Sequence, residues 1–191
     1  MSISYDQAQS LIDKYIKTEW IKLHSKETQV IMQALARKLK QDENIWGITG
    51  LLHDLDMDLI DIEKPKDHGR KTVELLKNEF DNVPDEMILA IEAHCENLGY
   101  LGIQRKSKLD FALSAAENLS GFLVACALVM PDKKIKEVKT ESVIKKLKKK
   151  DFARKVNREF IYDIKKAGVS LEQLITIALE ELIKISDEIG L

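Results

Sequence analysis

The chain holds four histidines, one of them in a His-Asp pair, whose side chains are suited to binding metal ions. The pair is His53-Asp54, and the other histidines are His24, His68 and His94. Imidazole nitrogens and carboxylate oxygens together suit divalent metals, and histidine favours the transition metals. Asp54 can offer two oxygens and thereby bridge two ions. Two ions about 3.5–4 Å apart can hold a phosphate ester, activate a water and stabilise the leaving oxygen.

Helical periodicity predicts that these side chains point inward. His24 and His94 are expected on the apolar faces of their helices, His68 in the first turn of another, and His53 at the end of a helix that is apolar nearly all round. A lone histidine is more often a core or capping residue, so the prediction depends on the whole set. The residues that share a face with His24 are Thr28, Ile31 and Leu35, and those that share one with His94 are Met87, Ile88, Ile91 and Leu98.

The pattern of the whole chain predicts an all-α fold. There are only eight glycines and three prolines, and strand-like alternation is scarce. Capping pairs are expected at Ser4 with Gln7, Ser107 with Asp110 and Ser170 with Gln173, and a further cap at Asp42. Gly47 and Gly50 are expected to let a neighbouring helix approach closely. The expected helices span residues 4–17, 19–40 or 24–40, 43–53, 67–80, 84–97, 107–130, 140–150, 152–160 and 170–185, with a loop over 54–65.

Composition indicates a soluble, globular chain. It has 191 residues, of which 45% are hydrophobic and 32% charged, enough for one domain or one domain with an appendage. Cys95 and Cys126 make no disulfide framework and fit a reducing interior. The first residues lack a secretory signal, and the longest apolar run, 121–130, is about half of the ~20 residues that a membrane span requires. We therefore expect a cytoplasmic protein with no membrane partner.

Charge is unevenly placed along the chain. Residues 133–158 contain twelve lysines and arginines against three acids, a net charge of +9, which leaves −11 for the rest. Such a stretch is most often a solvated face, but beside a metal site it would attract phosphorylated substrates. Arg70 and Arg105 are further candidates for binding phosphate. Phe152 is the only aromatic residue in this stretch, so a stacking platform for single-stranded nucleic acid has no support.

The order of the ligands resembles that of the HD superfamily of metal-dependent phosphohydrolases. His24, His53-Asp54, His68 and His94 are followed by a helical acid before an apolar run. The segments 50–56 and 114–121 are similar to a bacterial and archaeal branch of predicted HD hydrolases. The resemblance covers residues 23–157. It implies a compact multi-helix HD-domain bundle with a metal site in its centre, formed by residues 1–131, and a helical extension, 132–191, packed on it within one structural domain.

The resemblance also implies one or two bound divalent ions of Fe, Mn, Zn, Ni or Mg, and it implies which residues bind them. The final ligand, an aspartate in typical members, falls on Glu117, whereas Asp110 is interpreted as a helix cap. Several relatives with two ions carry paired histidines where this chain has His94-Cys95. Adjacent helix residues point about 100° apart, so Cys95 is expected to pack aside. The implied ligands are His24, His53, Asp54 and Glu117 for one ion, and Asp54, His68 and His94 for the second, with Asp54 also the catalytic residue.

Three functions follow from this pattern. The favoured one is hydrolysis of a phosphate ester, in a nucleotide or a small phosphorylated metabolite, by a metal-activated water. A di-iron oxygenase would use the same ligands. In the third, Glu117 and Cys95 mark a decayed site, and the basic stretch binds an anionic partner such as RNA. A calcium loop beginning at Asp54 is rejected, because it lacks the central glycine and the closing glutamate. The substrate and the oligomeric state stay open.

Overall fold

The computed structural model describes residues 3–61, 66–96 and 102–191, and these contain helices, turns and no strand. The prediction of an all-α fold is therefore confirmed. The helices are α1 (Tyr5–Tyr15), α2 (Glu19–Leu39), α3 (Glu43–Leu52), α4 (Arg70–Glu79), α5 (Asp85–His94), α6 (Lys108–Leu128), the short η2 (Ile135–Glu137), α7 (Thr140–Leu147), α8 (Arg158–Tyr162), η3 (Asp163–Ala167), α9 (Leu171–Lys184) and α10 (Ser186–Ile189).

Local hydrogen bonds fix the helix starts that the sequence predicts. Ser4, Ser107 and Ser170 each accept from the backbone N–H three residues on, and the side chain at that position accepts in return from the serine N–H. Asp42 accepts from the backbone N–H groups of Asn44 and Ile45. These caps satisfy N–H groups that a helix leaves unpaired at its first turn.

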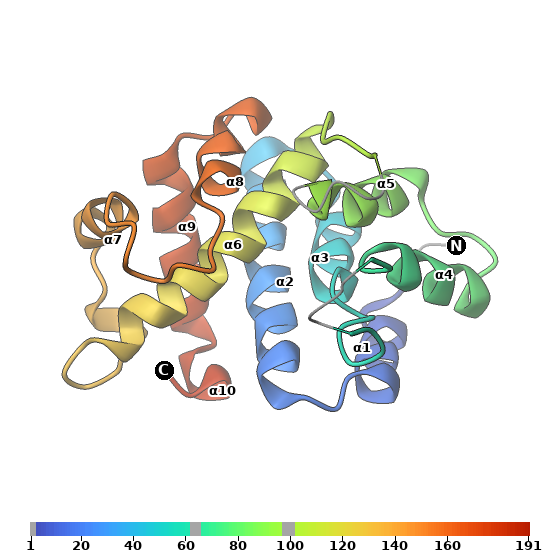
Figure 1. Cartoon of the computed structure of the whole chain (residues 1–191), viewed down its shortest axis with the longest axis horizontal. Coiled ribbons are helices and arrows are strands. Elements are labelled where there is room, and N and C mark those ends of the chain that lie inside the picture. The colour runs from blue at the N-terminus through green and yellow to red at the C-terminus, as the bar shows by residue number, and fades with distance from the viewer. Residues whose placement is uncertain (1–2, 62–65, 97–101) are drawn as a thin grey trace.

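The long helix α2 lies near the middle of the molecule (Figure 1). It packs against α3, α6 and α9, and α6 in turn packs against α5, α8 and α9. One hydrophobic cluster joins α2 and α6 to α9, and a second joins α1 and α3 to α4 and α5. A Cβ added at Gly50 would lie 3.0 Å from the backbone oxygen of Thr28, so this glycine permits the close approach of α2 and α3. The His-Asp pair at the end of α3 is thereby held against α2.

The helix α6 is apolar enough to raise the question of a membrane. By length and composition α6 could cross a membrane, but 61% of its most apolar 18-residue stretch is buried inside the protein. Its side chains belong to the hydrophobic cluster shared with α2 and α9. The apolar character of α6 is accounted for by its packing.

Several predicted helix ends are wrong by a few residues. α1 stops at Tyr15 rather than at residue 17, because Ile16 adopts an extended conformation and is buried. α6 stops at Leu128, two residues before the predicted end. α5 ends at His94, while the predicted end at residue 97 and the expected buried position 98 lie outside the described residues.

The predicted helix over residues 152–160 is also wrong, since only Arg158–Tyr162 is helical there. The Arg158 guanidinium donates to five backbone oxygens, one at the end of α7 and four in the irregular chain that follows it. These belong to Leu147, Lys149, Phe152, Ala153 and Val156. The carbonyls of Lys149 and Ala153 also accept from the backbone N–H groups of Phe152 and Val156, so the segment is a series of turns to which the Arg158 side chain adds hydrogen bonds.

Candidate metal centre

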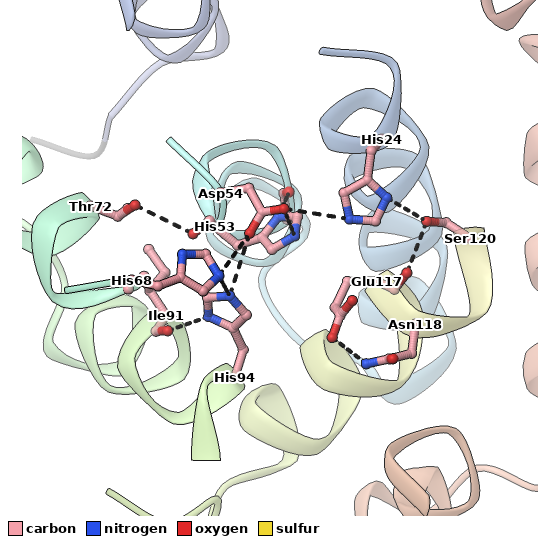
Figure 2. A network of polar contacts seen from close by, with 12 residues as sticks. His24, His53, Asp54, His68, Thr72, Ile91, His94, Glu117, Asn118 and Ser120 are labelled. Carbon is pink, nitrogen blue, oxygen red and sulfur yellow. Dashed lines mark hydrogen bonds and ion pairs between the residues drawn. The ribbon is translucent and has the colours of Figure 1, made fainter. Parts of the chain in front are cut away.

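Four imidazoles surround the carboxylate of Asp54 (Figure 2). His24 comes from α2, His53 follows α3, His68 precedes α4, and His94 ends α5. Each presents its Nε2 atom to Asp54. The Nε2 atoms of His24 and His53 lie 3.7 and 3.4 Å from Oδ2, and those of His68 and His94 lie 3.4 and 3.5 Å from Oδ1.

The other nitrogen of each ring, Nδ1, is held by a hydrogen bond. His53 and His94 donate to the backbone oxygens of Gly50 and Ile91, which can only accept. His68 donates to a carboxylate oxygen 2.8 Å away. His24 lies 3.0 Å from the Ser120 hydroxyl, whose own proton goes to a backbone oxygen. With Nδ1 held in this way, each ring turns its Nε2 toward Asp54. Burial lowers the pKa of His24 and of His53, so these two rings are neutral. The hydrogen bond to Asp56 outweighs burial and raises the pKa of His68 to about 10, and Cys95 and Asp54 raise the pKa of His94 well above its usual value.

His53 shows that this arrangement fits a cation. Its Nε2 is buried and has no hydrogen-bond partner, although the nearest carboxylate oxygen is 3.4 Å away. Burial lowers the pKa of His53 to about 3, so the ring is neutral and its lone pair faces a negatively charged oxygen. Two acceptors face to face in a buried site repel each other unless a positive ion lies between them.

The charge state of Asp54 agrees with this interpretation. Burial by itself would raise the pKa of the carboxyl group, but the surrounding imidazoles outweigh burial and hold it well below its usual value. Asp54 is therefore a carboxylate, the form that binds metal ions.

The two oxygens of Asp54 divide the ligands into two sub-sites. The ligand atoms of His24, His53 and Asp54 lie within 4.8 Å of one another and define the first sub-site. His68 and His94, facing the other oxygen, define the second. Nitrogen and carboxylate ligands of this kind suit divalent transition metals, with Asp54 as the bridge.

Comparison with known families agrees with the ligand order. The profile described as the HD domain matches residues 22–121, a little over half of the chain, and includes all four histidines, Asp54 and Glu117. The chain belongs to the HD domain family. Comparison with curated proteins and with solved structures gives no significant match. Metal-dependent hydrolysis is typical of the family, which makes a divalent metal site the natural interpretation of the cluster.

In this HD domain, His68 does not lie in the first turn of α4, where the sequence predicts it. It comes just before the helix, and Gly69 at the helix start has a φ of +77°, a conformation that favours glycine. Asp56 holds this segment. Its carboxylate accepts from His68 Nδ1 at 2.8 Å and from the backbone N–H groups of Gly69 and Thr72 at 2.8 and 3.1 Å. Asp56 is fully buried, and sequence reasoning gave it no role in the site.

Asp56→Asn is expected to weaken metal binding about 10–100-fold, the usual effect of losing a carboxylate that orients a histidine ligand. An amide that donates to His68 Nδ1 would move the imidazole proton to Nε2 and block the lone pair that faces Asp54. Metal affinity measured by competition with a chelating dye checks this. Asp67→Asn is the matched control, because Asp67 is exposed and pairs with Arg70 beside the site. An unchanged affinity in Asp56→Asn would contradict the orienting role.

Glu117 lies on the α6 side of the cluster, next to Asn118, which donates to its Oε1 (Figure 2). It is not part of the groups of ligand atoms within 4.8 Å of one another among the described residues. Burial raises the pKa of Glu117 to about 8. Its role as a ligand stays a prediction. Asp110 is a helix cap as predicted, since it accepts from the backbone N–H groups of Lys106 and Ser107 at 2.8 Å.

Cys95 does not pack aside, so that prediction is wrong. α5 ends at His94, and Cys95 leaves the helix with φ −87° and ψ 12°. The 100° separation expected within a continuing helix therefore does not apply. Its thiol lies 3.6 Å from both ring nitrogens of His94, and it forms one cluster of potential ligand atoms with His68 and His94.

The predicted phosphate-binding roles of Arg70 and Arg105 find no support. Arg70 is an exposed partner of Asp67. Arg105 is buried, pairs with Glu96 and Asp163, and stacks 3.6 Å from the centre of the Phe160 ring. Both side chains serve local structure, and Arg105 ties the start of α6 to η3.

A cavity of about 650 Å³ adjoins the cluster. His24, Asp54 and Glu117 line it on the side of the cluster, and Lys155 is the only lysine or arginine among the described residues around it. Most of the remaining wall is apolar. Of the twelve lysines and arginines in the basic stretch, Lys155 is thus the one that the fold brings to the candidate site. The sequence offered no signal that distinguishes it from its neighbours.

Proposed function

We propose that this HD domain hydrolyses a phosphate ester with two divalent metal ions bridged by Asp54. The observation that carries the proposal is the division of the four imidazoles, two facing each oxygen of one buried carboxylate. A single tetrahedral ion needs fewer ligands than this set provides. The arrangement supports a pair of ions better than one.

The residues of the chain have distinct tasks in such a reaction. Bound ions would lower the pKa of a water and neutralise the charge that develops on phosphoryl oxygens. The imidazoles hold their positions through the Nδ1 hydrogen bonds, so little reorganisation is needed. Glu117, whose burial raises its pKa to about 8, stands on the cavity wall where it can hold a proton or join the first sub-site.

The cavity indicates the class of substrate. Its volume is within the usual range for sites that bind small molecules. Leu23, Met57 and Val124 are part of an apolar wall, and Trp20 at the rim is 57% exposed. A single lysine offers little charge for a polyphosphate. We therefore propose a phosphate monoester with a flat or apolar organic group, such as a nucleotide or a similar phosphorylated metabolite.

Lys155→Ala is expected to raise KM about 5–10-fold with kcat within about twofold, because a flexible, exposed lysine attracts the phosphate equally before and during the reaction. Steady-state kinetics on the best substrate check this. Lys150→Ala is the matched control, since Lys150 belongs to the same basic stretch and does not line the cavity. A fall in kcat without a change in KM would contradict a role in substrate binding.

The experiment that tests the proposal is a screen of the purified protein, reconstituted separately with manganese, iron, zinc, nickel and magnesium, against a panel of phosphate esters. Release of inorganic phosphate that depends on the metal is the expected result. Oxygen uptake by the iron-loaded protein without phosphate release would instead indicate the oxygenase. Failure to bind metal under any of these conditions would refute the proposal.

A further inference from the structure

Gly121 is the one glycine, in the part of the chain that the structure describes, that neither backbone conformation nor close packing explains. Each of the others has a positive φ angle or, like Gly47 and Gly50, would bring an added Cβ to 3.0 Å or less from a neighbouring atom. A Cβ added at Gly121 would meet nothing within 4 Å. Gly121 lies within α6, where alanine would favour the helix more. The glycine therefore needs a reason other than the packing of α6.

The open space beside Gly121 belongs to the cavity next to the metal centre. Gly121 lines that cavity between Glu117, one turn earlier on α6, and Val124, one turn later. Glu117 extends from α6 beside the histidine cluster (Figure 2). Side chains on a helix lean toward its N-terminus, so a larger residue at position 121 would lean toward Glu117. Gly121 thus keeps open the way from the metal centre along α6.

The cavity wall beyond Gly121 is apolar and partly uncovered. Val124 and Leu128 continue the same face of α6, and Leu128 lies about 10 Å along the helix from Gly121 at 1.5 Å per residue. The helix α2 contributes Trp20 to the same cavity. Leu128 and Trp20 are 51% and 57% exposed. Large apolar side chains left exposed around a concave site favour an apolar ligand.

The polar side chain on this wall, Asn118, is already engaged. Its amide nitrogen donates to the backbone oxygen of Ser114 and to Glu117, and its amide oxygen accepts from the backbone N–H group of Asn157. The residues of α6 that line the cavity after Asn118 have no polar side-chain atoms. A nucleobase would need free donors and acceptors in the wall that it lies against, because its own polar groups would otherwise be buried unpaired. This wall favours an apolar group instead.

We propose that Gly121 determines substrate specificity, by letting an extended apolar group lie along α6 from the metal centre to Leu128. The proposal rests on the proposed function, because the phosphate of the ester must be held at the metal ions. It narrows the substrate class to phosphate monoesters of apolar alcohols whose organic group is about 10 Å long, the span of α6 from Gly121 to Leu128. Such a group would bury its surface against Val124, Leu128 and Trp20.

Steady-state kinetics on a series of straight-chain alkyl phosphates, from methyl to octyl, test the assignment. For the metal-loaded wild type, kcat/KM is expected to rise about two- to fourfold with each methylene that enters the cavity. Gly121→Leu is expected to lower kcat/KM for octyl phosphate at least about 30-fold, mainly through KM, because about three methylenes lose their place. Its kcat/KM for methyl phosphate is expected to stay within about threefold of the wild type, since uniform binding of the chain is what is lost.

Two control variants distinguish a role in specificity from a role in folding. Ala125→Leu places the same side chain one turn later on α6, at a residue that does not line the cavity, and is expected to keep the wild-type dependence on chain length. Gly121→Ala is expected to unfold at a higher temperature than the wild type, because alanine favours the helix and its Cβ meets no neighbour. A lower unfolding temperature would show that packing requires the glycine and would overturn the proposal.

A binding measurement separates this proposal from the proposed function. Octylphosphonate has a carbon–phosphorus bond that resists hydrolysis, and calorimetry is expected to show that Gly121→Leu binds it at least about 30-fold more weakly than the wild type. That result without hydrolysis of any ester would refute the proposed function and support Gly121 as a determinant of ligand size. Hydrolysis with the same dependence on chain length in both proteins would refute the role of Gly121 and leave the hydrolase standing. Faster hydrolysis of adenosine monophosphate than of octyl phosphate would refute the apolar substrate class.

Discussion

Asp54→Asn is expected to fold and to retain neither metal ion, with kcat/KM for phosphate ester hydrolysis reduced at least about 10³-fold. Asparagine has nearly the same shape, but it lacks the negative charge and the second oxygen that the four imidazoles face. A 10³-fold loss corresponds to about 4 kcal/mol of transition-state stabilisation. This is a modest part of the about 8–23 kcal/mol by which enzymes lower reaction barriers, and metal ions that neutralise phosphoryl charge can supply it. Elemental analysis together with circular dichroism and steady-state kinetics measures the effect.

The matched control for that variant is Asp58→Asn in the same acidic segment. Asp58 accepts from the backbone N–H groups of Lys17 and Thr18 and from the Thr18 hydroxyl, where α2 begins. Its loss is expected to lower the temperature of unfolding and to leave the metal content unchanged. Retention of two ions by Asp54→Asn would show that Asp54 is no bridge.

Removal of the metal is expected to lower the midpoint of thermal unfolding by roughly 8–16 °C. An ion present at 1,000 times its dissociation constant stabilises the folded state by about 4 kcal/mol, and 1 kcal/mol moves the midpoint by about 2–4 °C in a chain of this size. The ligands come from α2, α3, α5 and the start of α4, so the ions link four elements. Without them the lone pair of His53 faces a carboxylate.

Calorimetry of the metal-loaded protein before and after chelation measures this shift. Reloading with zinc or manganese is expected to restore the original midpoint. Asp54→Asn serves as the control, because chelation has no ion to remove from it. Equal midpoints for the loaded and metal-free wild type would mean that the ions add nothing to the stability of the fold.

Features encoded by neighbouring residues could be predicted from the sequence. The capping boxes at Ser4, Ser107 and Ser170 each depend on a bond over three residues. The inward directions of His24 and His94 follow from helical periodicity, which depends on the same short distances. These signals were sufficient for the fold class, whereas the gathering of the four histidines around Asp54 was predicted from their order along the chain and its resemblance to the HD superfamily.

Features that depend on distant residues could not be predicted in this way. Asp56 accepts a hydrogen bond from His68 across a turn that requires a positive φ at Gly69. In the sequence, nothing distinguishes Asp56 from the other acidic residues of its segment. The position of Cys95 depends on where α5 stops, which periodicity predicts poorly. The path of residues 147–157 depends on one arginine side chain that follows them.

The bonds of Arg158 to the carbonyl groups of the irregular segment have a consequence for how this protein can diverge. Lys155 and Val156, which border the cavity, sit in that segment, whereas the ligands sit in or beside the helices α2 to α5. Substitutions or short insertions between residues 148 and 157 can therefore reshape one wall while the ligand frame stays intact. Substrate preference can thus change during evolution while the residues that hold the metal ions stay the same. Related proteins can therefore act on different substrates by the same reaction.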